Sequence, residues 1–223
     1  MQQQTAVILG ATGMIGNLLT EQLLQDDSFR LVRLLVRRPI EKTHPKLEVK
    51  LVDFDNEEDI KNKLGSGDVI FSCMGTTQGN VKGDKALYRK IDHDIPVTVA
   101  RLGKEAGFHS FMLVSAVGSN ANSHTFYIKL KGEIERDISN INYGATGIFQ
   151  PSMLLGERKE KRTLERILQP VSKFWSLFLF GNWSRFKSIE GSDIVQAMIT
   201  AAKKQKSGVS FYEYNGMMRL AKK

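Results

Sequence analysis

The chain has 223 residues, of which 41% are hydrophobic and 25% charged, which is ordinary for a globular protein of one domain. No apolar run reaches the roughly 20 residues of a membrane-spanning helix, the single cysteine excludes an internal disulfide, and with no signal peptide visible we expect a cytoplasmic setting. The net charge of +8 makes nucleic acid a partner to consider, but no recognisable DNA- or RNA-binding module accompanies it, so we expect no specific nucleic-acid binding.

The first predicted element is a strand that leads directly into a glycine-rich loop. Residues 6–9 are apolar, and a G-x-x-G-x-x-G pattern separates them from a predicted helix at residues 14–25. Glycine lets backbone N–H groups approach a pyrophosphate, and a helix N-terminus adds unpaired donors and a partial positive charge. The pattern therefore indicates a dinucleotide cofactor. The predicted contacts in this loop are Gly10, Thr12, Gly13, Met14, Ile15 and Gly16.

Strands and helices then alternate along the chain. The predicted strands are residues 6–9, 31–36, 48–51, 68–73, 110–114 and 143–149, and the predicted helices are residues 14–25, 57–63, 85–92, 95–106, 126–139 and 192–204. This alternation is typical of an α/β protein with a parallel sheet and helices on both faces. We expect a Rossmann-type, doubly wound sheet in a single domain, with the ligand at the carboxyl ends of the strands.

The end of the second predicted strand bears on which dinucleotide binds. Proteins that prefer NAD usually carry an acidic residue there, whereas this chain has Arg37 and Arg38. Two guanidinium groups suit a 2′-phosphate, so we predict NADP(H) over NAD(H). After the third strand, Asp53 and Phe54 are placed beside the adenine, although a helix-capping role for Asp53 is an open alternative.

The loop after the fourth predicted strand is also assigned to the cofactor. Cys73 belongs to the apolar strand, where packing is favoured over reactivity. A glycine immediately beyond it leaves room for the ribose and the diphosphate. The predicted contacts are Met74, Gly75 and Thr76.

The candidate catalytic residues are Ser115, Tyr127 and Lys131. Ser115 ends an apolar strand, and Tyr127 and Lys131 lie four residues apart, so they share one face of a helix. A nearby ammonium stabilises a phenolate, and such a tyrosine exchanges a proton with a carbonyl or an alcohol. Ser115 would polarise the same oxygen, with Ser119 as the substitute if Ser115 points into the core, and Lys131 would also hold the nicotinamide ribose.

These motifs resemble the atypical short-chain dehydrogenases/reductases, in particular NAD(P)H-binding proteins of the Tat-interacting-protein oxidoreductase type. The resemblance spans about residues 5–156 and returns at residues 189–201, and its most specific parts are Cys-x-Gly-Thr-Thr and Tyr-x-x-x-Lys-Gly-Glu. It implies a Rossmann fold, NADP(H) and a serine–tyrosine–lysine site. It also implies that Pro151 and Met153 meet the nicotinamide amide. The chain departs from the family pattern at Ala116, where a second serine is frequent, and at Gln150, where arginine is common.

Residues 157–188 interrupt the alternation and are predicted to be a small C-terminal cap or an interface insertion. They are first strongly charged and then aromatic, particularly over residues 174–183. Three roles are open for the aromatic part: a lid over an apolar substrate pocket, an interface with a second copy or a protein partner, and a contact with a membrane surface.

Together these features predict an NADP-dependent oxidoreductase that transfers hydride between nicotinamide and a small carbonyl or alcohol substrate. The alternative is a regulator or redox sensor that binds NADP(H) and acts through a protein partner. A sugar-nucleotide epimerase or dehydratase is less favoured, because only about 70 residues follow Pro151 and leave little room for a nucleotide-sugar pocket. The histidines show no metal-ligand spacing, so we expect no metal site.

Overall fold

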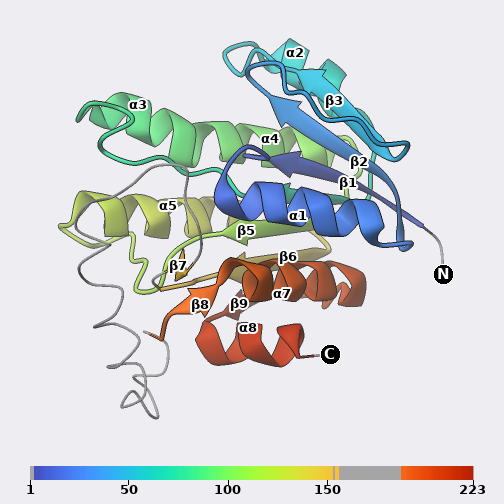
Figure 1. The fold of residues 1–223 in the computed structure, drawn as a ribbon. Helices are drawn as coiled ribbons and strands as arrows, with labels where there is room; N and C mark the ends of the chain where they lie inside the picture. Colours follow the sequence, from blue (N-terminus) through green and yellow to red (C-terminus); the bar gives the residue numbers. More distant parts are fainter. Residues whose placement is uncertain (1–2, 153, 156–186, 223) are drawn as a thin grey trace.

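A parallel sheet of seven strands forms the centre of the molecule in the computed structural model, which describes residues 3–152, 154–155 and 187–222 (Figure 1). The strands are β1 (Gln4–Leu9), β2 (Phe29–Val36), β3 (Leu47–Leu51), β4 (Val69–Ser72), β5 (Ser110–Val114), β6 (Ala145–Phe149) and β9 (Gly208–Tyr212). Their order is β3-β2-β1-β4-β5-β6-β9, and every neighbouring pair is parallel. The strand order reverses between β1 and β4, the point where α/β proteins of this kind bind nucleotides. The predicted Rossmann-type sheet is confirmed.

Helices cover both faces of the sheet and create two hydrophobic cores. They are α1 (Met14–Gln25), α2 (Glu57–Leu64), α3 (Lys85–Arg89), the π-helix η1 (Lys90–Asp94), α4 (Ile95–Glu105), α5 (Phe126–Asn140), α7 (Gly191–Lys204) and α8 (Tyr214–Ala221). The first core joins the sheet to α1, α7 and α8, and the second joins it to α2, α4 and α5.

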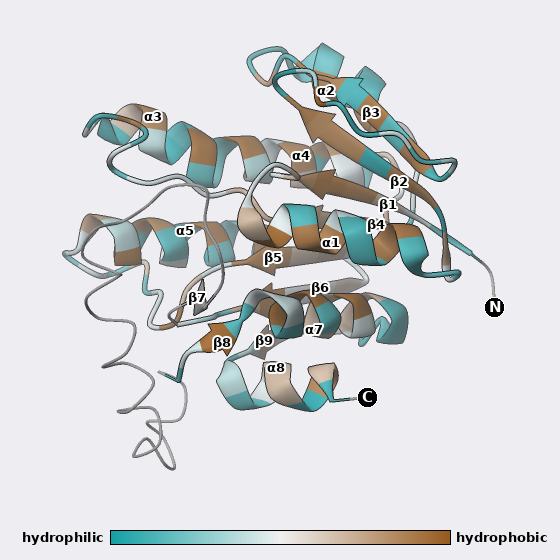
Figure 2. Cartoon of the chain, in the orientation of Figure 1, coloured by the Kyte–Doolittle hydropathy of each residue, from teal (hydrophilic) through white to brown (hydrophobic). Residues whose placement is uncertain are grey.

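Strand β1 is apolar from Ala6 to Leu9 because both of its faces are buried. In β1, Ala6 and Ile8 belong to the first core, whereas Val7 and Leu9 belong to the second. All four side chains are fully buried. Figure 2 shows the same result as hydrophobic colour along the inner strands. A strand that is buried on both faces needs no polar alternation, which is why residues 6–9 are recognisable in the sequence.

Helices 85–92 and 95–106 are predicted as separate, but the chain continues as helix between them. The connection is η1, in which the N–H of Ile95 donates to the carbonyl of Lys90. Pro96 follows and has no N–H to continue the regular ladder. A π-turn absorbs this defect, and such turns often occur at functional sites. It places Asp92 in the interior of the protein.

The C-terminal region contains elements that the sequence did not predict. Strand β9 and helix α8 extend the sheet and the first core, and a second, small parallel sheet pairs β7 (Leu154–Leu155) with β8 (Ile189–Glu190). Of the predicted cap at residues 157–188, only the last two residues are described, and the aromatic segment 174–183 lies outside the described residues. Within the described part of the chain, no helix is long and apolar enough to cross a membrane.

Candidate functional site

The glycine loop lies between the end of β1 and the start of α1, where its backbone is packed tightly. Gly10 has a φ of +75°, and a Cβ on it would lie 2.6 Å from the carbonyl oxygen of Cys73. A Cβ on Gly16 would lie 2.2 Å from the carbonyl oxygen of Gly10. Gly13 is the N-cap of α1, and no side chain caps this helix, so its first N–H groups can receive an anion. The loop therefore fits the pyrophosphate of a dinucleotide.

The side chains of the other residues predicted to contact the cofactor in this loop differ in their exposure to solvent. Thr12 is exposed and Met14 is half-buried, whereas Ile15 belongs to the first core. Ile15 can therefore meet a cofactor only through its backbone.

The two arginines after β2 lie one strand away from the glycine loop. Strands β1 and β2 are paired with Leu9 opposite Leu35, so Arg37 and Arg38 follow at the same edge of the sheet. Both side chains are exposed, and neither makes an ion pair with another described residue. Their guanidinium groups are free to receive a phosphate in this region.

The turn after β3 distinguishes between an adenine contact and a helix-capping role, the two roles that the sequence left open for Asp53. The side chain of Asn56, and not that of Asp53, caps α2 by accepting backbone N–H groups of its first turn. Asp53 instead accepts the N–H of Asp55 at 3.0 Å and remains exposed. The helix-capping alternative for Asp53 is therefore wrong. Phe54 is half-buried against the second core.

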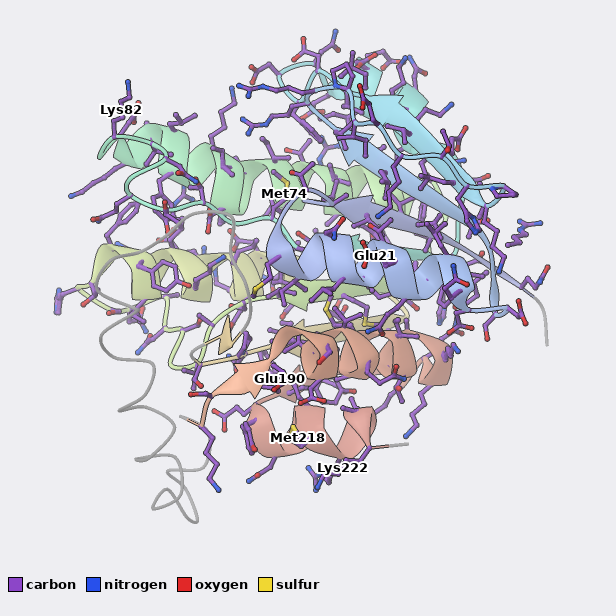
Figure 3. All side chains as sticks on the ribbon, viewed as in Figure 1. Glu21, Met74, Lys82, Glu190, Met218 and Lys222 are labelled. Atoms are coloured by element: carbon purple, nitrogen blue, oxygen red, sulfur yellow. The ribbon has the colours of Figure 1, made fainter. Side chains whose placement is uncertain are left out.

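The loop after β4 lies against the glycine loop. Met74, labelled in Figure 3, follows Cys73 here. Its backbone nitrogen would be 2.9 Å from a Cβ on Gly10. Gly75 is exposed, and a Cβ on it would have one near neighbour, Asp92 Oδ2 at 3.8 Å. Burial raises the pKa of the Cys73 thiol to about 12, so this sulfur stays protonated and packs against the first core.

A buried ion pair joins the predicted catalytic helix to η1. Lys131 Nζ lies 2.9 Å from Asp92 Oδ2, with the two side chains only 6% and 1% exposed. Asp92 Oδ1 also accepts the backbone N–H of Thr76 at 2.6 Å. The pair thus ties Lys131 to the loop that is assigned to the cofactor. No motif in the sequence points to Asp92, although it lies on the same helical face as the buried Tyr88 and Ile95, where a carboxylate is unexpected.

Tyr127 lies one helical turn before Lys131 and faces the solvent. Its side chain is 40% exposed, and Lys131 Nζ lies 6.0 Å from the centre of its ring. The structure therefore brings these two predicted residues together, with the phenol accessible to a substrate and the ammonium beneath it.

Ser115 occupies the predicted place after β5, but its hydroxyl has a protein partner. Its Oγ donates to Glu135 Oε1 at 2.5 Å and lies 3.3 Å from the Oγ of Ser119. Ser119 in turn donates to the carbonyl of Ala116 at 2.6 Å, so it is poorly suited to replace Ser115. Glu135, which is 7% exposed on α5, was also missed by the sequence analysis.

Two further residues were assigned to the cofactor by resemblance. Pro151 is buried after β6, and its carbonyl accepts the N–H of Val117 at 3.0 Å. Met153 lies outside the described residues.

The glycine of the Tyr-x-x-x-Lys-Gly-Glu motif has a packing role. A Cβ on Gly132 would lie 2.1 Å from the backbone nitrogen of Ala121. The loop before α5 therefore lies directly against the helix that carries Tyr127 and Lys131. This contact holds the loop that begins at Ser115 against the same helix.

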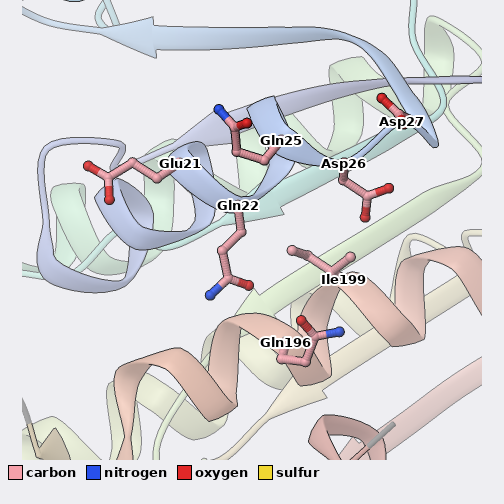
Figure 4. A pocket seen from close by; sticks show the side chains of 7 residues that line it. All are labelled: Glu21, Gln22, Gln25, Asp26, Asp27, Gln196 and Ile199. Carbon is pink, nitrogen blue, oxygen red and sulfur yellow. The ribbon is translucent and has the colours of Figure 1, made fainter.

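A separate groove between α1 and α7 does not belong to this site. It is lined by residues of the carboxyl-terminal half of α1, the turn after it, and α7, and most of them are polar: Glu21, Gln22, Gln25, Asp26, Asp27, Gln196 and Ile199 (Figure 4). It lies at the opposite end of α1 from the glycine loop. Within the described residues, no group of three or more histidine, cysteine, aspartate or glutamate side chains is arranged to hold a metal ion.

A solved structure supports the fold. The enzyme WbmH of Bordetella bronchiseptica, determined in complex with NAD+, matches with a TM-score of 0.73, covering 96% of this chain and 76% of that chain, at 14% sequence identity. Identity this low shows the fold alone.

Named relatives correct the predicted location. "Protein FMP52, mitochondrial" of Eremothecium gossypii is 37% identical over 154 residues, which are 69% of this chain and 68% of that protein. FMP52 proteins of three other fungi are also named as mitochondrial. The cytoplasmic setting expected from the sequence is therefore wrong, because these relatives point to mitochondria.

A second kind of relative agrees with the resemblance seen in the sequence. Protein HTATIP2 of Rattus norvegicus is 28% identical over 100% of this chain and 91% of that protein. The family model described as NAD(P)H-binding matches residues 10–164, a range that includes the glycine loop, Ser115, Tyr127 and Lys131. The chain therefore belongs to the NAD(P)H-binding family, among proteins with the fold of the short-chain dehydrogenases/reductases.

Proposed function

We propose that this chain is an NADP(H)-dependent oxidoreductase that interconverts a small carbonyl compound and the corresponding alcohol. The observation that carries the proposal is the exposed phenol of Tyr127 next to the buried ammonium of Lys131. A tyrosine that a substrate can reach, with a fixed positive charge nearby, is suited to exchange a proton with a substrate oxygen.

The position of each residue gives it a different role in the proposed reaction. When bound, NADP(H) would supply or accept the hydride. Tyr127 gives a proton to the substrate oxygen in reduction and takes it in oxidation, and Lys131 stabilises the negative charge that develops on the phenolic oxygen. Lys131 also holds the nicotinamide ribose, while Ser115 orients the substrate oxygen by a hydrogen bond. The backbone of the glycine loop holds the pyrophosphate.

The preference for NADP(H) rests on Arg37 and Arg38 and is tested by fluorescence titration. We expect NADPH to bind at least about 10-fold more tightly than NADH, because each guanidinium adds charge-assisted hydrogen bonds to the 2′-phosphate. An Arg37→Ala/Arg38→Ala variant should weaken NADPH binding roughly 10- to 100-fold and leave NADH binding unchanged. The matched control Arg101→Ala/Arg219→Ala removes two exposed arginines elsewhere and should bind NADPH normally. Equal affinities of the wild type for NADPH and NADH would contradict the preference.

Turnover is tested with a panel of aliphatic aldehydes, methyl ketones and ortho-quinones, followed by the absorbance of NADPH. We expect consumption of NADPH with at least one class of carbonyl, at about 1 per second or faster. Tight binding of NADPH without turnover of any member would instead favour a regulator that binds the cofactor and acts through a partner.

The remaining proposals concern organisation and location. We propose that residues 1–223 form one domain in which residues 157–188 are an insertion that contributes to substrate binding or to an interface. The names of the fungal relatives favour a mitochondrial location for this chain. Asp53, Phe54, Pro151 and Met153 remain predicted cofactor contacts.

A further inference from the structure

The two edges of the seven-stranded sheet differ in their protection against a further strand. An edge strand leaves backbone N–H and C=O groups free to pair with another chain, and charged side chains usually discourage such pairing. At one edge, β3 carries Glu48 and Lys50, which form an ion pair at 2.7 Å. At the other edge, β9 has the sequence Gly-Val-Ser-Phe-Tyr, without a charge or a proline, and its pairing with β6 is regular. The β9 edge is therefore open to an added strand.

The backbone of β9 directs free hydrogen-bonding groups toward this edge. The N–H of Gly208 and the carbonyl of Tyr212 are bonded to residues at the two ends of β6, at 3.0 and 2.9 Å. Backbone direction alternates along a strand, so the N–H and C=O groups of Val209 and Phe211 point away from β6. No described strand pairs with them. The two residues offer the same row of donors and acceptors that pairs strands inside the sheet.

A groove lies along this edge, where an added strand would run. It has a volume of about 370 Å³ and is lined by residues of β9 and of α8, which lies beside β9 at the end of the sheet (Figure 1). Its apolar part includes Val209 and Phe211, whose side chains are 40% and 55% exposed. Its charged part consists of Lys206, which shortly precedes β9, and Arg219 on α8, and both are exposed.

The charge of the groove favours an acidic partner. Among the described residues that line it, two are cations and none is acidic. Neither Lys206 nor Arg219 forms an ion pair with another described residue. A second copy of the chain would bring the same cations and a net charge of +8 to this edge, which disfavours pairing of β9 with β9. A segment with carboxylates meets the opposite charge.

We propose that the β9 edge binds an extended acidic segment of a partner protein, which adds an eighth strand to the sheet. The backbone of the segment pairs with Val209 and Phe211, its apolar side chains pack on these two residues, and its carboxylates meet Lys206 and Arg219. Strand addition of this kind takes affinity from main-chain hydrogen bonds and specificity from alternate side chains. The ligand therefore alternates apolar and acidic residues. The inference does not rest on the proposed function, because it uses none of the residues assigned to the cofactor or the reaction.

Binding is tested with short fluorescein-labelled peptides by fluorescence anisotropy. The full chain should bind a peptide of alternating valine and glutamate, with blocked ends, with a Kd of about 100 µM or tighter. The same peptide with lysine in place of glutamate should bind at least about 10-fold more weakly. A third peptide, N-methylated at its central residues, keeps the side chains but lacks the N–H groups, so it should also bind at least about 10-fold more weakly. Equal binding of the N-methylated peptide, or no binding of the glutamate peptide, would overturn the proposal.

Variants of the chain locate the peptide on β9. Val209→Pro removes one free N–H without removing a bond to β6 and should weaken binding about 3- to 10-fold, whereas Val209→Thr keeps the N–H and should bind normally. Lys206→Glu/Arg219→Glu should weaken binding of the glutamate peptide at least about 10-fold and strengthen binding of the lysine peptide. The matched control Lys61→Glu/Lys82→Glu makes the same change in net charge at two exposed lysines outside the groove and should bind as the wild type does.

Two other occupants of the edge give different results. A wild type that sediments as a dimer, with Val209→Pro a monomer, would assign the edge to a second copy and overturn the proposal. Binding of phosphatidylserine vesicles that Lys206→Glu/Arg219→Glu abolishes, without binding of the glutamate peptide, would assign the cations to a membrane surface and overturn it as well. The affinity for NADPH and the turnover of carbonyls decide the proposed function separately from all of these measurements.

Discussion

Replacing Asp92 by alanine should destabilise the protein by about 3–5 kcal/mol, because it leaves the ammonium of Lys131 buried without a counter-charge. It also removes the acceptor for the N–H of Thr76. Urea unfolding of the wild type and the variant measures the difference in free energy. Asp92→Asn retains an oxygen for Thr76 and should lose less stability than Asp92→Ala.

A compensating double variant distinguishes the effect of the Asp92–Lys131 ion pair on stability from the effect of Lys131 on activity. Replacing a buried ion pair by apolar residues of similar volume is often neutral, so Asp92→Leu/Lys131→Met should recover much of the lost stability while remaining inactive. As a control, Arg101→Ala breaks an exposed ion pair with Glu57 and should cost at most about 1 kcal/mol. An Asp92→Ala protein whose stability stays within about 1 kcal/mol of the wild type would show that Lys131 finds water or another partner.

Local patterns explain why most of the fold was predictable. Three segments are contiguous in the chain and pack against one another: the apolar run at residues 6–9, the glycine loop and the helix that begins at Met14. The predicted strands agree with β1 to β6 to within a few residues. Strands β1 and β4 are recognisable because they are buried and apolar over most of their length, whereas β3, at the other edge of the sheet, alternates apolar and charged residues. Strand β9 lacks that signal: it lies at the edge of the sheet, and Val209 and Phe211 are exposed there.

The site was predictable only where a motif carries it. Tyr127 and Lys131 are four residues apart, so their proximity follows from helical geometry. The partners of Lys131 and Ser115 come from tertiary contacts that no spacing reveals: Asp92 reaches Lys131 through η1, and Glu135 reaches Ser115 across the gap between α5 and β5. The usable signal in both cases is a carboxylate on an otherwise buried face of a helix, which requires a partner.

Tyr127→Phe should lower the turnover number by a factor of about 10² to 10⁴, because it removes the group that exchanges a proton with the substrate oxygen. The ring and its packing remain, and the side chain is partly exposed, so stability should stay within about 0.5 kcal/mol of the wild type. The affinity for NADPH should not change. Steady-state kinetics with the carbonyl found in the panel, together with a fluorescence titration, measure these quantities.

A second tyrosine provides the matched control for this variant. The hydroxyl of Tyr143 is buried and donates to the carbonyl of Ala100 at 2.6 Å, far from any proposed chemistry. Tyr143→Phe should therefore lose about 1 kcal/mol of stability and keep its turnover, the reverse of the effect at Tyr127. If Tyr127→Phe turns over as fast as the wild type, the acid–base role is wrong. A wild type that binds NADPH tightly and converts no carbonyl of the panel would instead favour the regulator alternative, in which the cofactor is sensed and no substrate is converted.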